Sequence, residues 1–143
     1  MKTAILLIGH GSRVAGANQP LYEIATLVQE MTGCEIVEVC CRQAQADWLQ
    51  AGIDRCVARG AERLLLHPYF LYAGAHVVDE LPAQMALAAK RHPQLAMLLS
   101  EPLGVDRKLA EVVCARLAAA LGEEGWELPL LAGPARPEGP HRP

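Results

Sequence analysis

The chain has 143 residues, of which 52% are apolar and 20% charged, and its formal net charge is −3. This length predicts one domain with a sizeable core, and the slightly acidic balance argues against a nucleic-acid partner. The opening apolar run, residues 4–8, is too short for a signal peptide or a membrane span, and the five cysteines show no CxxC spacing, so we expect a reduced, cytoplasmic protein with no membrane partner.

Two strand–helix units are predicted in the first 60 residues. Residues 3–9 form a continuous apolar run ended by glycine, as expected of a strand covered on both faces. A helix over residues 18–32 follows, with Asn18 as its N-cap and Gly33 as its end. The second strand and helix are predicted over residues 35–41 and 46–59.

Two further units are predicted downstream. The third strand is closed by Pro68, and the third helix has Pro82 in its first turn, where proline is tolerated. The last helix begins after Asp106 and ends at Gly122. The strands cover residues 63–67 and 95–99, and the helices residues 80–91 and 107–121. This alternation predicts an α/β fold with a mainly parallel sheet of four or five strands and helices on both faces.

The composition changes past Gly122. Residues 126–132 suit either a short edge strand or a segment that packs back on the domain. Residues 133–143 carry proline at every third position from 134 and have no apolar anchors, which predicts an extended, flexible tail. We therefore expect one α/β domain over residues 1–132 and a proline-rich tail over residues 133–143.

Two histidines follow predicted strands, in turns that contain glycine. His10 lies in Gly-His-Gly-Ser-Arg (9–13), and His76 lies between the third strand and the third helix. Because the carboxyl ends of parallel strands meet at one edge of a sheet, we expect both imidazoles at that edge. Two imidazoles there can hold a divalent transition metal and accept protons near neutral pH. Taken singly, each has a simpler interpretation: His10 in a tight turn, and His76 on the surface beside a capping Asp79.

The same edge offers donors for an anionic ligand. The amide groups around Gly11, together with Ser12 and Arg13, are suited to gripping carboxylates. Arg42 and Gln43 follow the second strand and are expected nearby. The glycine motif is not a phosphate-binding loop, since neither GxxxxGK[ST] nor GxGxxG occurs. A serine-hydrolase site is also disfavoured, because there is no GxSxG motif.

These motifs resemble the small sirohydrochlorin chelatases of CbiX type. The resemblance covers about residues 1–121. It implies a single chelatase half that acts as a homodimer and needs no organic cofactor. The matching pieces are Gly-His-Gly-Ser-Arg (9–13), Asn18, Pro68-Tyr-Phe-Leu (68–71) with Gly74 and His76, Asp79 with Leu81-Pro82, and Leu103-Gly104 with Asp106.

The resemblance also implies a reaction. Members of this family insert Co²⁺, Fe²⁺ or, in some lineages, Ni²⁺ into sirohydrochlorin, on the way to cobalamin, sirohaem or related tetrapyrroles. The metal-binding and catalytic histidines of the family map onto His10 and His76. Sirohydrochlorin is rich in carboxylates, so an acidic protein needs local cations and N–H donors to bind it. The residues expected to contact it are Gly11, Ser12, Arg13, Arg42, Gln43 and Gly74, with Tyr69, Phe70 and Leu71 as an apolar wall, although core packing explains those three equally well.

One departure keeps other functions open. Gln43 stands where family members usually have a glutamate, and an amide can neither take a proton nor offset metal charge. The main alternative is therefore a non-catalytic relative that binds a tetrapyrrole or a metal. A small metal carrier is a further possibility, and it predicts metal binding without affinity for tetrapyrroles.

Overall fold

The computed structural model describes residues 1–12, 14, 16–42, 47–72 and 74–130, without the side chains of Ala75, His76, Val78 and Glu123. The chain forms two compact units, residues 1–104 and residues 105–143. The predicted boundary between domain and tail, at residues 132 and 133, lies outside the described residues. In the described ranges, no helix has both the length and the apolar character needed to cross a membrane.

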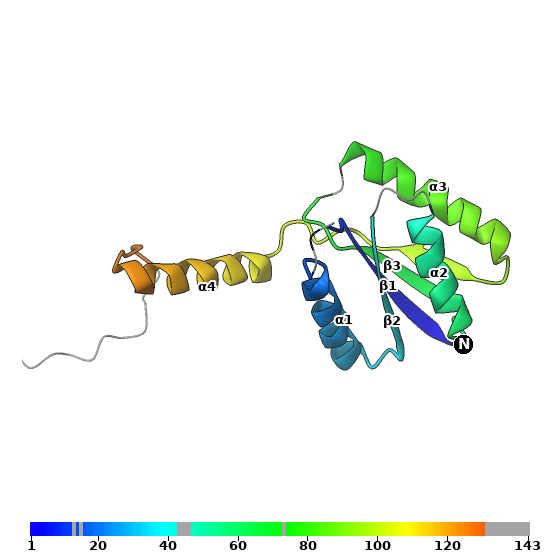
Figure 1. Ribbon diagram of the computed structural model, residues 1–143, viewed down its shortest axis with the longest axis horizontal. Helices are drawn as coiled ribbons and strands as arrows, with labels where there is room; N and C mark the ends of the chain where they lie inside the picture. Colours follow the sequence, from blue (N-terminus) through cyan, green and yellow to red (C-terminus); the bar gives the residue numbers. More distant parts are fainter. Residues whose placement is uncertain (13, 15, 43–46, 73, 131–143) are drawn as a thin grey trace, which may run out of the picture. The chain divides into compact units, whose positions relative to one another are not determined.

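The first unit is built on a parallel sheet. Strand β1 pairs with β2 on one side and with β3 on the other, and β4 pairs with β3, giving the order β2-β1-β3-β4 (Figure 1). In this register Gly9 lies opposite Cys41, and Ile8 lies opposite Pro68. The predicted parallel sheet is confirmed, with four strands among the described residues. The strands are β1 (Thr3–Gly9), β2 (Ile36–Cys41), β3 (Arg63–Pro68) and β4 (Ala96–Leu99).

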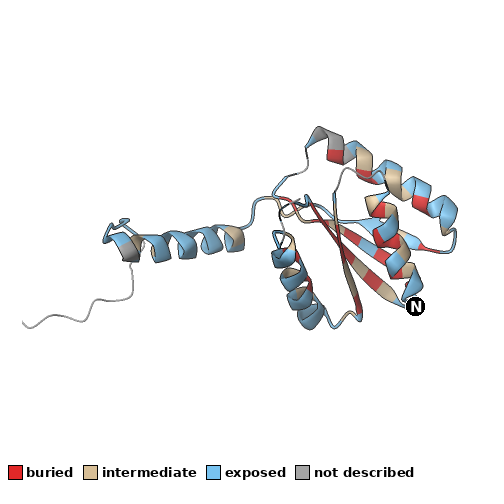
Figure 2. Cartoon of the chain, viewed as in Figure 1, coloured by how far each residue is buried: buried red, intermediate tan, exposed pale blue. Residues whose placement is uncertain are grey.

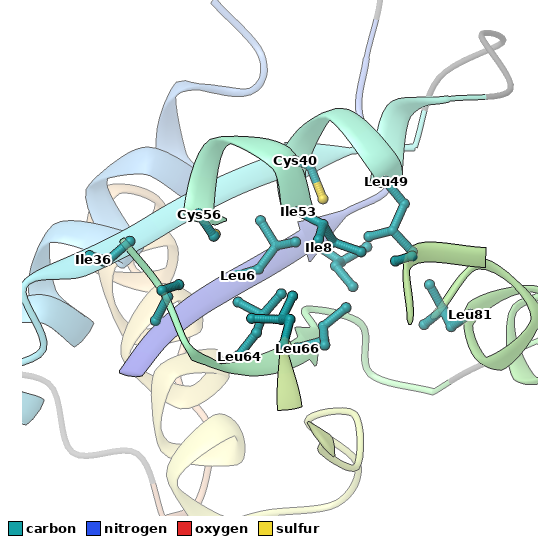
Figure 3. Packing of buried hydrophobic residues seen from close by; sticks show 14 of the residues in the cluster. Leu6, Ile8, Ile36, Cys40, Leu49, Ile53, Cys56, Leu64, Leu66 and Leu81 are labelled. Carbon is teal, nitrogen blue, oxygen red and sulfur yellow. The ribbon is translucent and has the colours of Figure 1, made fainter. Parts of the chain in front are cut away.

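Helices cover both faces of this sheet, as predicted. Side chains alternate along β1, so Leu6 and Ile8 face one cluster of apolar residues and Leu7 faces the other. The larger cluster lies beneath α2 (Trp48–Ala58) and α3 (Ala75–Arg91), as Figures 2 and 3 show. The smaller cluster lies beneath α1 (Gln19–Thr32). Burial of each large aliphatic side chain stabilises this arrangement by roughly 1.5–3 kcal/mol.

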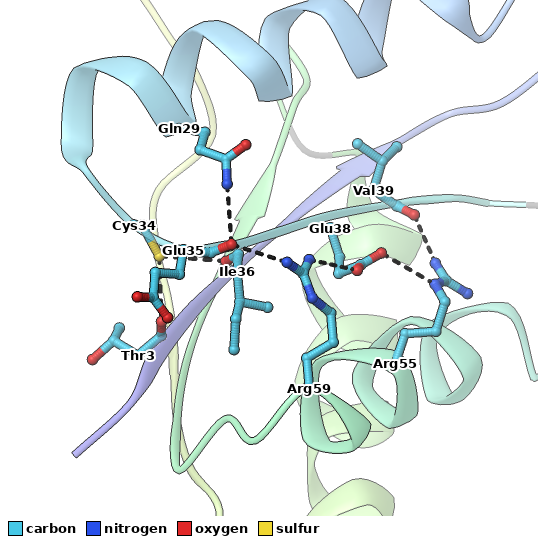
Figure 4. A network of polar contacts seen from close by, with 9 residues as sticks. All are labelled: Thr3, Gln29, Cys34, Glu35, Ile36, Glu38, Val39, Arg55 and Arg59. Atoms are coloured by element: carbon cyan, nitrogen blue, oxygen red, sulfur yellow. Dashed lines mark hydrogen bonds and ion pairs between the residues drawn. The ribbon is translucent and has the colours of Figure 1, made fainter.

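Strand β2 is an edge strand, and two arginines, one in α2 and one at its C-cap, cover the outer side of β2. Nη2 of Arg55 donates to the carbonyl oxygen of Val39 at 2.7 Å, and Nη2 of Arg59 donates to that of Glu35 at 3.0 Å (Figure 4). Both guanidinium groups also contact the carboxylate of Glu38. These bonds occupy backbone acceptors that an additional strand would need, so they protect the edge from pairing.

Helix α3 begins five residues earlier than predicted, at Ala75 instead of residue 80. Pro82 lies inside the helix, where it forgoes one backbone hydrogen bond because proline has no N–H group. Burial outweighs that loss, since Val77 and Leu81, one turn apart, are both buried in the core. The sequence rule that places proline in a first turn was therefore wrong here. His76 belongs to the first turn of the helix, and Asp79 is not its cap.

The second unit contains α4 (Arg107–Glu124). Asp106 is its N-cap, as predicted, and accepts a hydrogen bond from the backbone N–H of Lys108 at 2.8 Å. The predicted end at Gly122 is wrong: Gly122 stays helical, and the left-handed turn is made by Gly125, with φ of 73°. Residues 126–130 form no strand, and the remaining predictions for the tail fall outside the described residues.

A polar cluster joins α2 to the end of α3. Nη2 of Arg91 donates to Oδ2 of Asp54 at 2.6 Å, and Nε2 of His92 lies 2.7 Å from Oδ1. Partial burial raises the pKa of Asp54, but hydrogen bonds from His92 and Arg91 outweigh it, so its pKa is lowered overall. A lowered pKa in the folded state means that this carboxylate stabilises the fold above its unfolded pKa of about 4.

We predict that Asp54→Asn flattens the acid side of the stability profile. As the pH falls through the lowered pKa of Asp54, the wild-type chain loses the contribution of this carboxylate, whereas the variant has none to lose. Urea unfolding at pH values from 7 down to 3 measures the difference. Identical pH dependence in the two proteins would show that ionisation of Asp54 contributes nothing to stability.

Candidate functional site at the carboxyl edge of the sheet

His10 lies at the carboxyl end of β1, is exposed, and stacks on Phe70. The two ring centroids are 3.9 Å apart, with 29° between the ring planes. Phe70 is only 4% exposed, and its carbonyl oxygen accepts a hydrogen bond from the N–H of Leu103 at 2.9 Å. The imidazole therefore rests against a ring held by the core, which orients it while leaving it open to solvent.

The glycines on either side of His10 are needed for close packing against neighbouring elements. Gly11 has φ of +78°, and a Cβ atom on it would lie 2.7 Å from the carbonyl oxygen of Arg42. A Cβ atom on Gly9 would lie 2.5 Å from Cδ2 of Leu21. The N–H of Arg42 donates to the carbonyl oxygen of Gly9 at 2.8 Å. The loop that carries His10 is thus packed against the end of β2.

Ser12 is engaged within its own turn. Its hydroxyl oxygen accepts a hydrogen bond from the N–H of Val14 at 3.1 Å, and its carbonyl oxygen accepts one from Nδ2 of Asn18 at 3.3 Å. Asn18 occupies the N-cap position of α1, but its side chain makes no capping hydrogen bond. It ties the glycine loop to the helix instead. Arg13, the other predicted donor of this loop, lies outside the described residues.

Arg42 follows β2 and forms an ion pair with Glu80 of α3. Its Nη2 atom lies 3.1 Å from Oε2 of Glu80, and the two side chains are 43% and 30% exposed. The sequence did not predict Glu80 as the partner of Arg42, although its position one helical turn after His76 places both residues on the same face of α3. Gln43, the other residue after β2 that is predicted to contact the ligand, lies outside the described residues.

The segment after β3 contains both packed and exposed residues. Tyr69 donates its N–H to the carbonyl oxygen of Ile8 at 2.8 Å and packs beside the smaller core cluster. Leu71 and Tyr72 are exposed. Gly74, in an extended conformation, is the N-cap of α3. Of the three predicted wall residues, Phe70 is the one in contact with His10.

His76 is placed through its backbone in the first turn of α3. The N–H of the next residue, Val77, donates to the carbonyl oxygen of Gly74 at 3.0 Å, and Val77 is buried. The side chain of His76 lies outside the described part, so a metal site shared with His10 stays a prediction. Among the side chains that are described, no three from His, Cys, Asp and Glu are grouped as a metal site.

His67, in β3, has a structural environment. Its Nδ1 atom lies 2.7 Å from the hydroxyl oxygen of Ser100. Burial lowers the pKa of His67, although a hydrogen bond with the backbone of Glu101 acts in the opposite direction. A neutral, hydrogen-bonded imidazole of this kind serves the fold and makes a useful control for His10.

A pocket of about 390 Å³ lies along the outer side of β2. Tyr22, Cys41, Trp48 and Arg55 are among its lining residues. None of the described lining residues belongs to the predicted site. The functional hypothesis therefore concerns the carboxyl ends of the strands and not this pocket.

Known proteins match most of this chain. The chloroplastic sirohydrochlorin ferrochelatase of Arabidopsis thaliana is 32% identical over 117 residues, which are 82% of this chain and 52% of that protein. The sirohydrochlorin cobaltochelatase of Methanopyrus kandleri is 29% identical in an alignment 141 residues long, which covers 85% of this chain and 99% of that protein. This chain spans about half the length of the first curated relatives that it matches.

Solved structures agree with this similarity. The sirohydrochlorin chelatase SirB of Bacillus subtilis subspecies spizizenii, in complex with cobalt, has a TM-score of 0.74 and 29% identity, covering 83% of this chain and 51% of that one. The family model described as CbiX matches residues 4–120, which include the glycine loop, the Phe70 segment and α3. This chain therefore belongs to the CbiX family.

Proposed function

We propose that this protein inserts a divalent metal, Co²⁺ or Fe²⁺, into sirohydrochlorin, with Ni²⁺ as a further candidate substrate. The observation that carries the proposal is the placement of His10, which is exposed at the carboxyl edge of β1 and oriented by Phe70. The names of the relatives support the same reaction class, since they are sirohydrochlorin ferrochelatases and cobaltochelatases.

The chemistry requires a bound metal ion, a bound macrocycle and acceptors for two pyrrole N–H protons. In the proposed mechanism, neutral imidazoles of His10 and His76 bind the ion through nitrogen and present it to one face of the ring. As the ion passes to the macrocycle, each of the two protonated pyrrole nitrogens exchanges its proton for a bond to the metal. The released imidazole of His10, or a water beside it, accepts one of these protons, and a second water accepts the other.

Substrate recognition in this proposal uses the donors of the sheet edge. Arg13, Arg42 and Gln43, with the amide groups of Gly11 and Ser12, would contact the carboxylates of the macrocycle. Phe70 acts through His10, while the exposed Leu71 offers apolar surface to the ring. Gly74 brings the backbone to the start of α3, at the same edge.

We further infer that the protein acts as a homodimer in the cytoplasm. The chain matches 99% of the Methanopyrus relative but about half of the Arabidopsis one, so two copies supply as much chain as the longer protein. All five cysteines are free, which fits a reducing compartment. The proposed chemistry draws on imidazoles and water and requires no organic cofactor.

The proposal is tested by mixing the purified protein with sirohydrochlorin and one metal at a time. Insertion is followed by the change in the absorption spectrum of the tetrapyrrole. Acceleration over the protein-free rate with Co²⁺ or Fe²⁺ would support chelatase activity. Tight binding of sirohydrochlorin without metalation by any metal would identify the non-catalytic alternative, which the amide at position 43 favours.

Gln43→Glu provides a sharper test of that alternative. We predict that this variant inserts metal faster than the wild-type protein, because a carboxylate offsets metal charge and accepts a proton, which an amide cannot do. Initial rates at several pH values measure the effect, which should be clearest at lower pH. A rate that is unchanged or lower would show that position 43 is not where a carboxylate is needed.

A further inference from the structure

We propose that Glu80 pairs with Arg42 in the free protein and is replaced there by a carboxylate of the tetrapyrrole when the tetrapyrrole binds. Glu80 is then a specificity-determining residue, which weakens the binding of any ligand unable to displace it. This inference rests on the proposed function, since it names the group that recognises a carboxylate-rich substrate.

The backbone of Arg42 is fixed at the site. Gly9 pairs with Cys41 in the sheet, so His10 and Arg42 are the next residues along β1 and β2. The N–H of Arg42 donates to the carbonyl oxygen of Gly9 at 2.8 Å, and its own carbonyl oxygen packs against Gly11. The backbone of Arg42 is therefore anchored beside the loop that carries His10, and its guanidinium group extends from there to Glu80.

Glu80 lies on α3, the helix that carries His76. It lies in the second turn of α3, four residues after His76 and on the same face of the helix. The contact of 3.1 Å between Nη2 of Arg42 and Oε2 of Glu80 thus links the end of β2 to the helix that carries His76. A ligand that spans the end of β2 and the start of α3 meets this ion pair.

The contact is suited to exchange. Among the described residues, Glu80 is the one acidic group within 4.0 Å of Arg42, and both side chains are accessible to water. Arg55 differs, because its guanidinium group also donates to the backbone carbonyl oxygen of Val39. Exposed ion pairs hold weakly in water, so a ligand carboxylate that pairs more closely with the planar guanidinium group can replace Glu80.

Binding of metal-free sirohydrochlorin, followed by tetrapyrrole fluorescence, tests the exchange. Glu80→Gln should lower the Kd by about 2- to 5-fold, because the ligand no longer competes with an internal carboxylate. Arg42→Met should raise the Kd by about tenfold or more, and Arg42→Lys should give an intermediate value. In the Arg42→Met background, Glu80→Gln should have no further effect, which is the signature of coupling between the two residues.

Glu111→Gln is the matched control. Glu111 forms another exposed ion pair, with Arg107 of α4 at 3.7 Å, so this variant has the same change of residue and charge elsewhere. Its Kd should equal that of the wild-type protein. Circular dichroism establishes that each variant is folded before its Kd is compared.

Three outcomes would overturn the exchange alone. The Kd of Glu80→Gln could equal that of Glu111→Gln, or it could be higher than that of the wild-type protein. In the third outcome, Glu80→Gln lowers the Kd even in the Arg42→Met background. Each of these requires that the wild-type protein binds sirohydrochlorin. A wild-type protein that does not bind it would overturn the proposed function, and this inference with it.

Discussion

Replacing either His10 or His76 with alanine is expected to reduce metal insertion by about 100-fold or more. Each variant loses one of the two imidazoles proposed to hold the metal, and His10→Ala also removes a proton acceptor. We expect both positions to accept a smaller side chain without disrupting the fold, because His10 is exposed and His76 lies in the first turn of a helix anchored by Val77. The spectral change of sirohydrochlorin on addition of Co²⁺ measures the rate.

His67→Ala is the control for this pair. It removes an imidazole bonded to Ser100, outside the proposed site, so the folded protein should keep an insertion rate close to that of the wild type. Urea unfolding of all three variants separates loss of chemistry from loss of structure. Normal turnover in His10→Ala or in His76→Ala would refute the assignment of that histidine.

Gly11→Ala is expected to lower both stability and activity. An alanine at φ of +78° is strained, and its Cβ would lie 2.7 Å from a backbone carbonyl oxygen that cannot rotate away. Backbone strain of this kind costs about 1–3 kcal/mol, and the contact with Arg42 adds to it. The loop must shift to relieve the overlap, which moves His10 relative to Phe70. Urea unfolding and the insertion rate measure the two effects.

Gly16→Ala separates the two causes. Gly16 has nearly the same dihedral angle, with φ of +77°, but a Cβ atom there meets nothing within 4 Å. This variant should lose stability through strain alone, by about 1–2 kcal/mol, and should keep its activity. Equal losses in the two variants would mean that the contact between Gly11 and Arg42 has no role in placing His10.

The strands were predictable because their physical signal is local. The apolar runs around Leu6 and Leu64 have no other stable arrangement than burial in a sheet, and short connections through helices require parallel pairing. The start of α3 was not predictable in this way. It depends on the burial of Val77 and Leu81, which a local rule about Pro82 does not take into account.

The meeting of the loops at the carboxyl ends of the strands was predictable, but the contacts between their side chains were not. The convergence of parallel strands predicts that the segments after β1 and β3 meet, and the contact of His10 with Phe70 shows that they do. Stacking between these two rings depends on side-chain conformations that no sequence pattern encodes. The pairing of Arg42 with Glu80 depends on how α3 crosses the end of β2, so it also required the structure.

The account depends on one ion bound jointly by the two imidazoles. Crystals grown with Co²⁺, measured at the cobalt absorption edge, locate that ion directly through anomalous scattering. We predict a single strong peak for each subunit within bonding distance of an imidazole nitrogen of His10 and of His76, roughly 2.0–2.1 Å as in zinc–imidazole sites. Cobalt bound elsewhere, or bound by one of these histidines with the other turned away, would contradict the account.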